Sequence, residues 1–133
     1  MAADPLVILN AIAQTIFDKK GFNILALDVR GVSTLTDYVI IAEGYVDKHV
    51  GSIAQAIMQN LKAMGVTPVC SEGLATGDWV VIDYMDVMVH LFMPGLRDKY
   101  MLEQLWKEGA IVDLSIDTAS QEISQEARVD RFS

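Results

Sequence analysis

The chain has 133 residues, 52% of them hydrophobic, which suits one folded domain and argues against wholesale disorder. Its 18 acidic and 10 basic residues give a formal net charge of −8. This sign is wrong for a protein that grips a nucleic-acid backbone over a wide surface, because affinity there comes from Lys and Arg. It suits a basic protein partner better, although acidity also serves solubility alone.

The sequence gives no sign of export or membrane insertion. It contains no apolar run of the roughly 20 residues that span a bilayer. The N-terminal sequence MAADPLVILNAIAQ lacks the basic stretch of a signal peptide and reads as the start of a helix. Cys70 is the single cysteine, so no internal disulfide can form, as is typical of a reducing compartment. We therefore expect a cytoplasmic protein without membrane contact.

The first predicted element is a helix that begins at Asp4 and Pro5. Aspartate is a good N-cap residue, and proline fits the first helical position because its missing N–H is not needed there. Apolar residues then recur at helical spacing. The helix is expected to end near residues 19–20, with Gly21 as its stop.

Two strands and a second helix are predicted next. Residues 23–29, NILALDV, form the first strand. Residues 37–44, DYVIIAEG, form a nearly apolar strand that suits the centre of a sheet. Asp47 is the expected cap of a helix whose apolar stripe continues until Gly65 ends it.

The C-terminal half is predicted to hold three strands and a helix. Residues 67–70 form a short strand, and residues 71–78 form a loop. The segment GDWVVIDYMDVMVHLFMP, residues 77–94, forms a β-hairpin. Residues 96–106, LRDKYMLEQLW, form an amphipathic helix.

This order of elements predicts an α/β fold with a mixed sheet and helices packed mainly on one face. The strands at 37–44 and 67–70 are joined through a helix and can run parallel, whereas hairpin strands are antiparallel. The chain offers too few helices to cover both faces. From Ser115 the sequence becomes polar and acidic, so the domain is placed at residues 1–114 and a tail at residues 115–133.

A two-residue turn at Met85 and Asp86 would set the register of the hairpin and separate its two faces. One face is apolar and is expected to pack against helices; it comprises Val80, Ile82, Tyr84, Val87, Val89 and Leu91. The other face carries Trp79, Val81, Asp83, Met88, His90 and Phe92. We expect this second face to be at least partly open, with the aromatic character of an interface centre.

Alternatives stay open for this second face. Trp79 and Phe92 also fit residues that merely cover a sheet edge, and His90 fits a half-buried structural histidine. Met85 occupies a turn position for which glycine is preferred, so the register is open to a slip of one residue. Such a slip would exchange the two faces.

Motifs for metal binding and catalysis are largely missing. His49, His90 and Cys70 are the available nitrogen and sulfur ligands and show no short spacing, so no metal site is expected. The phosphate-binding loop, dinucleotide-binding and serine-hydrolase motifs do not occur. Cys70 stands at a strand end, where a lone cysteine is usually inert packing.

Carboxylates provide the remaining route to catalysis. Asp83 and Asp86 lie three residues apart, and Asp37 and Glu43 flank a neighbouring strand. Paired acids of this kind can hold two metal ions for nucleotidyl or phosphoryl transfer. The chain has no basic, glycine-rich phosphate cradle. A metal-dependent transferase therefore stays as the alternative to a binding protein.

Four segments carry a resemblance to a known family: ALDVRGVSTLTDYVIIAEG, KHVGSIAQAI, EGLATGDWVVIDYMDVMVHLF and YMLEQLW. In order and at the expected distances, they resemble the Iojap family, also called ribosomal silencing factor RsfS. The resemblance covers residues 5–107, which is most of the chain. The most specific segment is GDWVVIDYMDVMVH, followed by YMLEQLW.

The resemblance implies a fold of nucleotidyltransferase-like topology without that activity. Family members bind the large ribosomal subunit through a ribosomal protein at its intersubunit face. They block joining of the small subunit and so repress translation when nutrients are short. The resemblance thus implies a non-enzyme with no catalytic residues, metal or cofactor. The Gly-Ser and paired-aspartate pattern of nucleotidyltransferases is absent here, which supports a binding role.

The resemblance places the docking surface on the hairpin and its flanks. We expect a basic ribosomal protein to contact this surface, with little direct contact to nucleic acid. The expected partner-binding residues are Glu72, Asp78, Trp79, Asp83, Tyr84, Met85, Asp86 and His90. A third alternative is a homodimer through the face of Trp79, which would compete with docking.

The chain departs from the family pattern at two places. Residues 44–49 read GYVDKH where many relatives have GTSSRH, so small hydroxyl residues are replaced. Met85 stands where a glycine is commoner. The tail beyond Asp113 lies outside the resemblance and is assigned no function.

Overall fold

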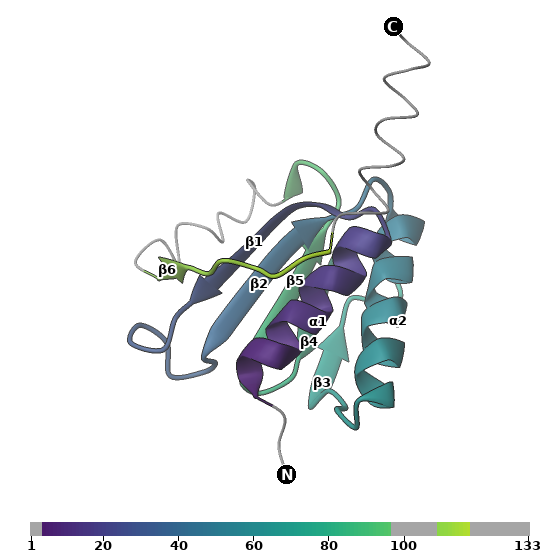
Figure 1. Ribbon diagram of the computed structural model, residues 1–133. Helices are drawn as coiled ribbons and strands as arrows, with labels where there is room; N and C mark the ends of the chain where they lie inside the picture. Colours follow the sequence, from purple (N-terminus) through teal and green to yellow (C-terminus); the bar gives the residue numbers. More distant parts are fainter. Residues whose placement is uncertain (1–3, 97–108, 118–133) are drawn as a thin grey trace, which may run out of the picture.

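The computed structural model describes residues 4–96 and 109–117. One mixed sheet and two helices make up this part of the chain (Figure 1). The strands, in sheet order, are β3 (Cys70–Glu72), β4 (Trp79–Asp83), β5 (Val87–Phe92), β2 (Tyr38–Glu43), β1 (Phe22–Asp28) and β6 (Ala110–Ile111). Helices α1 (Pro5–Asp18) and α2 (Asp47–Ala63) lie side by side on the same face. The predicted α/β class, with a mixed sheet and helices on one face, is confirmed.

Membrane insertion has no support in the helices. Neither described helix combines the length and the apolar character needed to cross a bilayer.

Helix α1 begins as its sequence predicts. The carboxylate of Asp4, the N-cap, accepts a hydrogen bond from the Leu6 N–H at 2.9 Å, and Pro5 follows in the first turn. At the other end, the Gly21 N–H donates to the Ile16 carbonyl and the Lys20 N–H donates to Phe17. These are the two hydrogen bonds of a Schellman motif.

The left-handed residue of this motif is Lys20, with φ of 66°, and not the glycine that the sequence suggested as the stop. Gly21 is required for another reason. A Cβ at this position would lie 2.5 Å from the Cγ2 atom of Ile16, so only glycine allows the chain to turn this closely against the helix.

Helix α2 corrects the predicted cap. Val46 is the N-cap and supplies no side-chain hydrogen bond, whereas Asp47 is the first helical residue. An acidic residue in the first turn still suits the positive end of the helix dipole. The C-terminus agrees with the prediction, because Gly65 adopts φ of 81° and closes a second Schellman motif.

The central strands are β2 and β5, which pair in parallel from Tyr38 with Val87 to Glu43 with Phe92. All six residues of β2 are buried, as expected for a central strand. Strands β2 and β3 run in the same direction, as the sequence allowed, because β3 and β5 are both antiparallel to β4 and β5 is parallel to β2. In the sheet, β4 and β5 separate β2 from β3, so sequence neighbours are not spatial neighbours.

The predicted strand at 67–70 is shifted towards the C-terminus. The structure has β3 at Cys70–Glu72, so the first two residues of the predicted loop at 71–78 belong to the strand. Pairing with β4 decides this, because Cys70 lies opposite Asp83 and Glu72 opposite Val81. Pro68 has no N–H to donate to a ladder, which favours the later start.

The predicted hairpin register is confirmed. Trp79 pairs with Phe92, and the Tyr84 N–H donates to the Val87 carbonyl at 2.9 Å. The turn is not of type I′, in which both central residues have positive φ, because only Met85 has a positive φ, of 73°. The Asp86 N–H donates to the Tyr84 carbonyl, so Met85 is the centre of a strained three-residue turn.

The two faces of the hairpin belong to different apolar clusters. The predicted helix-facing residues of β4 and β5 pack with α1 and α2 in the main core, together with Tyr38 and Ile40. On the far face, a smaller cluster holds Phe92 and residues of β1 and β2, with Trp79 and Leu96 packed against it. The main core carries most of the buried aliphatic surface and therefore most of the hydrophobic stabilisation.

The segment after β6 runs over the helix-bearing face of the sheet to the flank of α1 that lies away from α2 (Figure 1). The Ser115 N–H donates to Asn10 at 2.7 Å, the Asp117 N–H donates to Gln14 at 2.6 Å, and Ile116 packs against the main core. The domain boundary after residue 114 stays a prediction; residues 115–117 continue along α1. The predicted helix at 96–106 lies outside the described residues, apart from Leu96.

Replacing Met85 by glycine is expected to stabilise the protein by about 1 kcal/mol. Glycine adopts positive φ without the steric cost borne by other residues, and the exposed Met85 side chain loses little packing. Urea denaturation measures the change. Met64→Gly is the matched control, since Met64 ends α2 with an ordinary φ of −87° and should lose stability. A destabilised Met85→Gly variant would contradict the inferred strain.

Candidate functional site

Trp79, His90 and Phe92 form an aromatic cluster on the sheet face away from the helices. The Trp79 Nε1–H donates to His90 Nδ1 at 3.2 Å. The rings of Trp79 and Phe92 lie 5.4 Å apart, and those of His90 and Phe92 lie 6.2 Å apart and nearly parallel. Phe92 is fully buried and supports the ring of Trp79, which stacks on it.

His90 is a neutral, buried residue. Its side chain is only 5% exposed, and burial lowers its pKa to about 4. Nδ1 accepts the hydrogen bond from the Trp79 N–H, so the ring proton of the neutral form resides on Nε2. His90 therefore orients Trp79 from below. It is more deeply buried than the half-buried alternative envisaged from the sequence.

The loop before β4 holds Trp79 from the other side. The Asp78 carboxylate accepts hydrogen bonds from Thr76 Oγ1 at 2.7 Å and from the Trp79 N–H at 3.0 Å. Gly73 has φ of 85°, and a Cβ there would collide with the Trp79 carbonyl oxygen. The loop predicted at residues 71–78 includes Gly73, but this role was not predicted; its only signal in the sequence is a glycine six residues before a tryptophan.

The hairpin turn forms a second group, at the other end of β4. The Asp83 carboxylate accepts a hydrogen bond from the Met85 N–H at 2.8 Å. Met85 itself is 65% exposed. The Asp86 carbonyl accepts from the N–H groups of Asp37 and Tyr38, which joins the turn to the start of β2.

Tyr84 points away from this turn into the main core. Its side chain is only 6% exposed, and burial raises its pKa to about 12. Among the described residues, none bonds to its hydroxyl. Its place in the core is the one expected from the hairpin alternation, and it does not share a surface with Trp79.

The eight residues assigned to docking therefore divide by position. Trp79 and His90 are in contact, and Asp78 adjoins them. Asp83, Met85 and Asp86 lie at the turn, whereas Glu72 is exposed on β3 at the sheet edge. The half-buried side chains of Val81 and Met88 lie between these groups on the same face. This face is partly open, as the sequence predicted.

A metal centre finds no support in the described ranges. No three His, Cys, Asp or Glu side chains there come together in a way that could hold an ion. Asp83 is engaged in the turn by the Met85 N–H. The structure thus does not show the carboxylates considered for phosphoryl transfer converging on one point.

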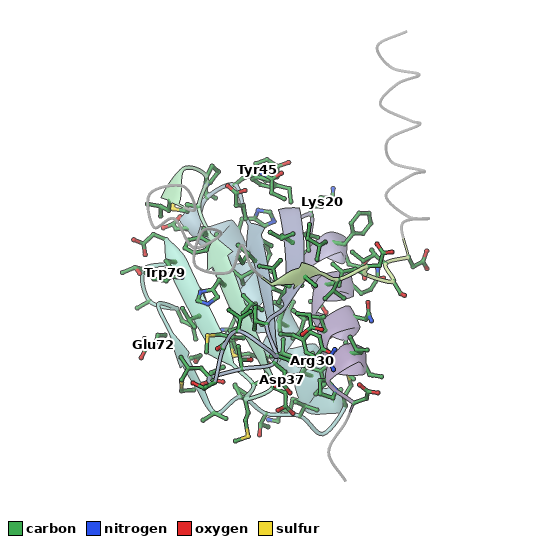
Figure 2. The ribbon with its side chains drawn as sticks, turned by 90° about the vertical axis from the view of Figure 1, so that its left-hand side faces the viewer. Lys20, Arg30, Asp37, Tyr45, Glu72 and Trp79 are labelled. Carbon is green, nitrogen blue, oxygen red and sulfur yellow. The ribbon has the colours of Figure 1, made fainter. Side chains whose placement is uncertain are left out.

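A second aromatic group, which was not predicted from the sequence, surrounds Tyr45. Its ring packs on Phe22 at 4.5 Å and stacks on His49 at 5.4 Å between centroids. In Figure 2, Tyr45 and Trp79 lie towards the same end of the sheet, whereas Arg30 and Asp37 lie at the opposite end. The signal in the sequence was an aromatic residue in the unusual stretch at 44–49.

Comparison with known proteins gives one family. The family described as "Ribosomal silencing factor during starvation" matches residues 3–132. A Bacillus subtilis protein named ribosomal silencing factor RsfS is 38% identical over 107 residues, which are 80% of this chain and 91% of the relative.

More distant and structural comparisons agree. A crystal structure of a Chromobacterium violaceum protein matches with a TM-score of 0.77 at 32% identity, over 88% of this chain and 97% of that chain. A mouse protein named mitochondrial assembly of ribosomal large subunit protein 1 is 27% identical over 94 residues, 68% of this chain and 41% of the mouse protein.

Acid should destabilise the protein through His90. Its pKa is near 6.5 when unfolded and about 4 when folded, so the unfolded state binds the proton first as pH falls. The stabilisation is complete above pH 6.5, and roughly 3 kcal/mol is lost between pH 6.5 and 4. Unfolding free energies measured across this range test the effect.

The matched variant is His90→Gln, which keeps an acceptor for the Trp79 N–H but does not titrate. Its stability should vary less with pH than that of the parent, because the two proteins differ only at position 90. Identical pH profiles for the two proteins would show that His90 does not carry the effect.

Gly73→Ala should destabilise the protein by about 3 kcal/mol or more, because it combines positive φ with a collision against β4. Gly65→Ala provides the comparison: Gly65 also has positive φ, but nothing lies within 4 Å of its added Cβ, so a loss of about 1 kcal/mol is expected. Thermal and urea unfolding measure both. Equal losses would mean that the contact with Trp79 adds nothing.

Proposed function

The chain belongs to the ribosomal silencing factor family, and from this premise we propose that it binds the large ribosomal subunit and blocks joining of the small one. It thereby represses translation. The observation that carries the proposal is the far face of β4 and β5, where Trp79 is held by His90, Phe92 and its own loop. A surface that is already ordered loses little entropy when a partner docks on it.

Blocking of this kind needs no catalytic group. A protein bound at the intersubunit face occupies the space that the small subunit must enter. Affinity and position then determine activity, and no bond is made or broken. The family is named for silencing, which is consistent with a protein that is not an enzyme.

The proposed docking surface is defined as Trp79, Val81, Asp83, Met85 and Met88. It combines an aromatic anchor with aliphatic side chains and few charges, which is typical of interface centres. Two other residues of the predicted set act indirectly. His90 fixes the ring of Trp79, and Tyr84 fixes the turn from within the core.

Acidic side chains lie around this surface and indicate a basic partner. Glu72 and Asp78 are exposed, and Asp86 is half-buried at the turn. Rim charges mainly steer the encounter and set its orientation. We therefore infer that a basic ribosomal protein contacts this face, within the bacterial cytoplasm where its ribosomes reside.

The direct test is sedimentation with separated ribosomal subunits. The protein should cosediment with the large subunit, not with the small one, and its addition should reduce the 70S peak when the two are mixed. No cosedimentation at micromolar protein would sink the proposal. Binding without any loss of 70S particles would leave a ribosome-associated protein that does not silence.

Trp79→Ala should weaken binding to large subunits by about 2 kcal/mol or more, or roughly 30-fold, if Trp79 is a central anchor. Trp79→Phe keeps a ring on Phe92 and should lose less. Circular dichroism must first show that each variant is folded. A folded Trp79→Ala variant with parental affinity would remove Trp79 from the surface, and an altered self-association in sedimentation would instead indicate a homodimer through this face.

Reversal of a rim charge should change mainly the rate of association with the large subunit. Glu72→Lys is expected to lower the rate of binding to large subunits several-fold at low salt, with convergence towards the parental rate at high salt. Asp113→Lys is the matched control, because Asp113 lies beyond β6 at the other edge of the sheet. Equal rates for both variants would argue against a basic partner at the β3 edge. Stopped-flow fluorescence of labelled protein provides the rates.

A further inference from the structure

The group around Tyr45 forms an exposed aromatic platform. The Tyr45 side chain is 64% exposed although its ring packs on Phe22 and stacks on His49. The planes of the Tyr45 and His49 rings lie at an angle of 10°. Val46 beside it is also exposed. Large exposed aromatic rings held by other rings are common where a flat ligand binds.

His49 holds this platform in place. Its Nδ1 accepts a hydrogen bond from the Tyr45 N–H at 2.9 Å, and its Nε2 lies 2.7 Å from the Lys19 carbonyl. Both bonds are satisfied when the ring is neutral with its proton on Nε2. His49 thus ties the end of α1 to the start of α2, and the ring of Tyr45 needs no ordering before it binds.

Three lysines lie at the same end of the molecule. Lys19 and Lys20 follow α1, and Lys48 is in the first turn of α2; all three are exposed. Figure 2 shows Lys20 beside Tyr45 at this end. Within residues 4–96 and 109–117, the single ion pair joins Arg30 and Asp28, so none of these lysines is paired there.

Nearby acids are engaged in local hydrogen bonds. Asp18 accepts from Gln14, and Asp47 accepts from the backbone N–H of Lys48 at 2.8 Å. Glu43 is buried and accepts from Asn23 at 2.6 Å. Asp18 and Asp47 remain exposed. Acidic side chains therefore lie among the three lysines, which do not form a continuous basic face.

The platform is continuous with the docking surface. A Cβ on Gly77 would lie 2.6 Å from the Asp47 carbonyl, so the loop that leads into Trp79 abuts the start of α2. The Gly44 N–H donates to the Phe92 carbonyl at 2.9 Å, which links the residue before Tyr45 to the residue on which the Trp79 ring stacks. A partner bound on the docking surface would therefore place the molecules that adjoin it close to Tyr45.

We propose that this platform binds RNA: an unpaired base stacks on Tyr45, and the flanking phosphates contact Lys19, Lys20 and Lys48. An exposed ring beside several lysines is the combination that single-stranded RNA recognises, because every base has a π-face and every linkage a charge. Elsewhere the described charges are mainly acidic, which confines the contact to this end. Insofar as the RNA belongs to the large subunit, the inference rests on the proposed function.

The probe is deproteinised RNA from purified large subunits, measured by filter binding across a series of salt concentrations. Tyr45→Ala should weaken binding about tenfold, whereas Tyr45→Phe should bind like the parent. Replacement of Lys19, Lys20 and Lys48 by alanine should reduce the slope of log affinity against log salt by about 2, since each phosphate contact contributes about 0.7. Lys62→Ala, in the last turn of α2, is the matched control and should change little.

Failure of this inference is distinguishable from failure of the proposed function. If the parent binds whole large subunits but not their naked RNA, the RNA contact is overturned and docking stands. If Tyr45→Ala reduces binding to whole subunits alone, the platform contacts protein, which also overturns the RNA contact. Binding to naked RNA that is sensitive to Tyr45 supports the inference even if subunit joining is unaffected.

Discussion

The position of β5 between β4 and β2 is the constraint on which the rest of the structure depends. Its residues alternate between the main core and the docking face, so its register decides the use of every hairpin side chain. The antiparallel pairing with β4 places Trp79 over Phe92. The parallel pairing with β2 brings Gly44 to the same end, and so brings the Tyr45 platform beside Trp79.

The two aromatic groups share a physical design. In each, a histidine accepts one N–H and holds an aromatic ring that remains partly exposed. The difference lies in burial, because His90 is enclosed in the sheet face while His49 spans two helix ends near solvent. Both arrangements order the ring before a partner arrives, which lowers the entropic cost of docking.

Charge separates the two proposed contacts. The acidic rim around β3 and the loop before β4 suits a basic protein, whereas the lysines at the ends of α1 and α2 suit phosphate. A net charge of −8 describes the whole chain and conceals this segregation. The expectation of little contact with nucleic acid came from that average. The proposed RNA contact is restricted to one end and is compatible with an acidic protein.

Much of the fold followed from local sequence. Asp4 and Pro5 started α1, Gly65 ended α2, and the alternation of the hairpin assigned its core face correctly. Such features depend on a few neighbouring residues, whose conformational preferences act over one turn or one strand pair. The family was also recognisable, because its signature lies in one continuous hairpin.

Pairing across the chain could not be predicted in this way. The parallel partner of β2 is β5 and not β3, β3 begins later than its own sequence suggested, and β6 was not anticipated. Of the candidate site, the shared face of Trp79 and His90 was predicted, but the contacts of Gly73 and Tyr45 were not. The sequence by itself determined the elements, the hairpin register and the family; only the tertiary structure decided which strands became neighbours and which rings met, because those contacts join residues far apart in the chain.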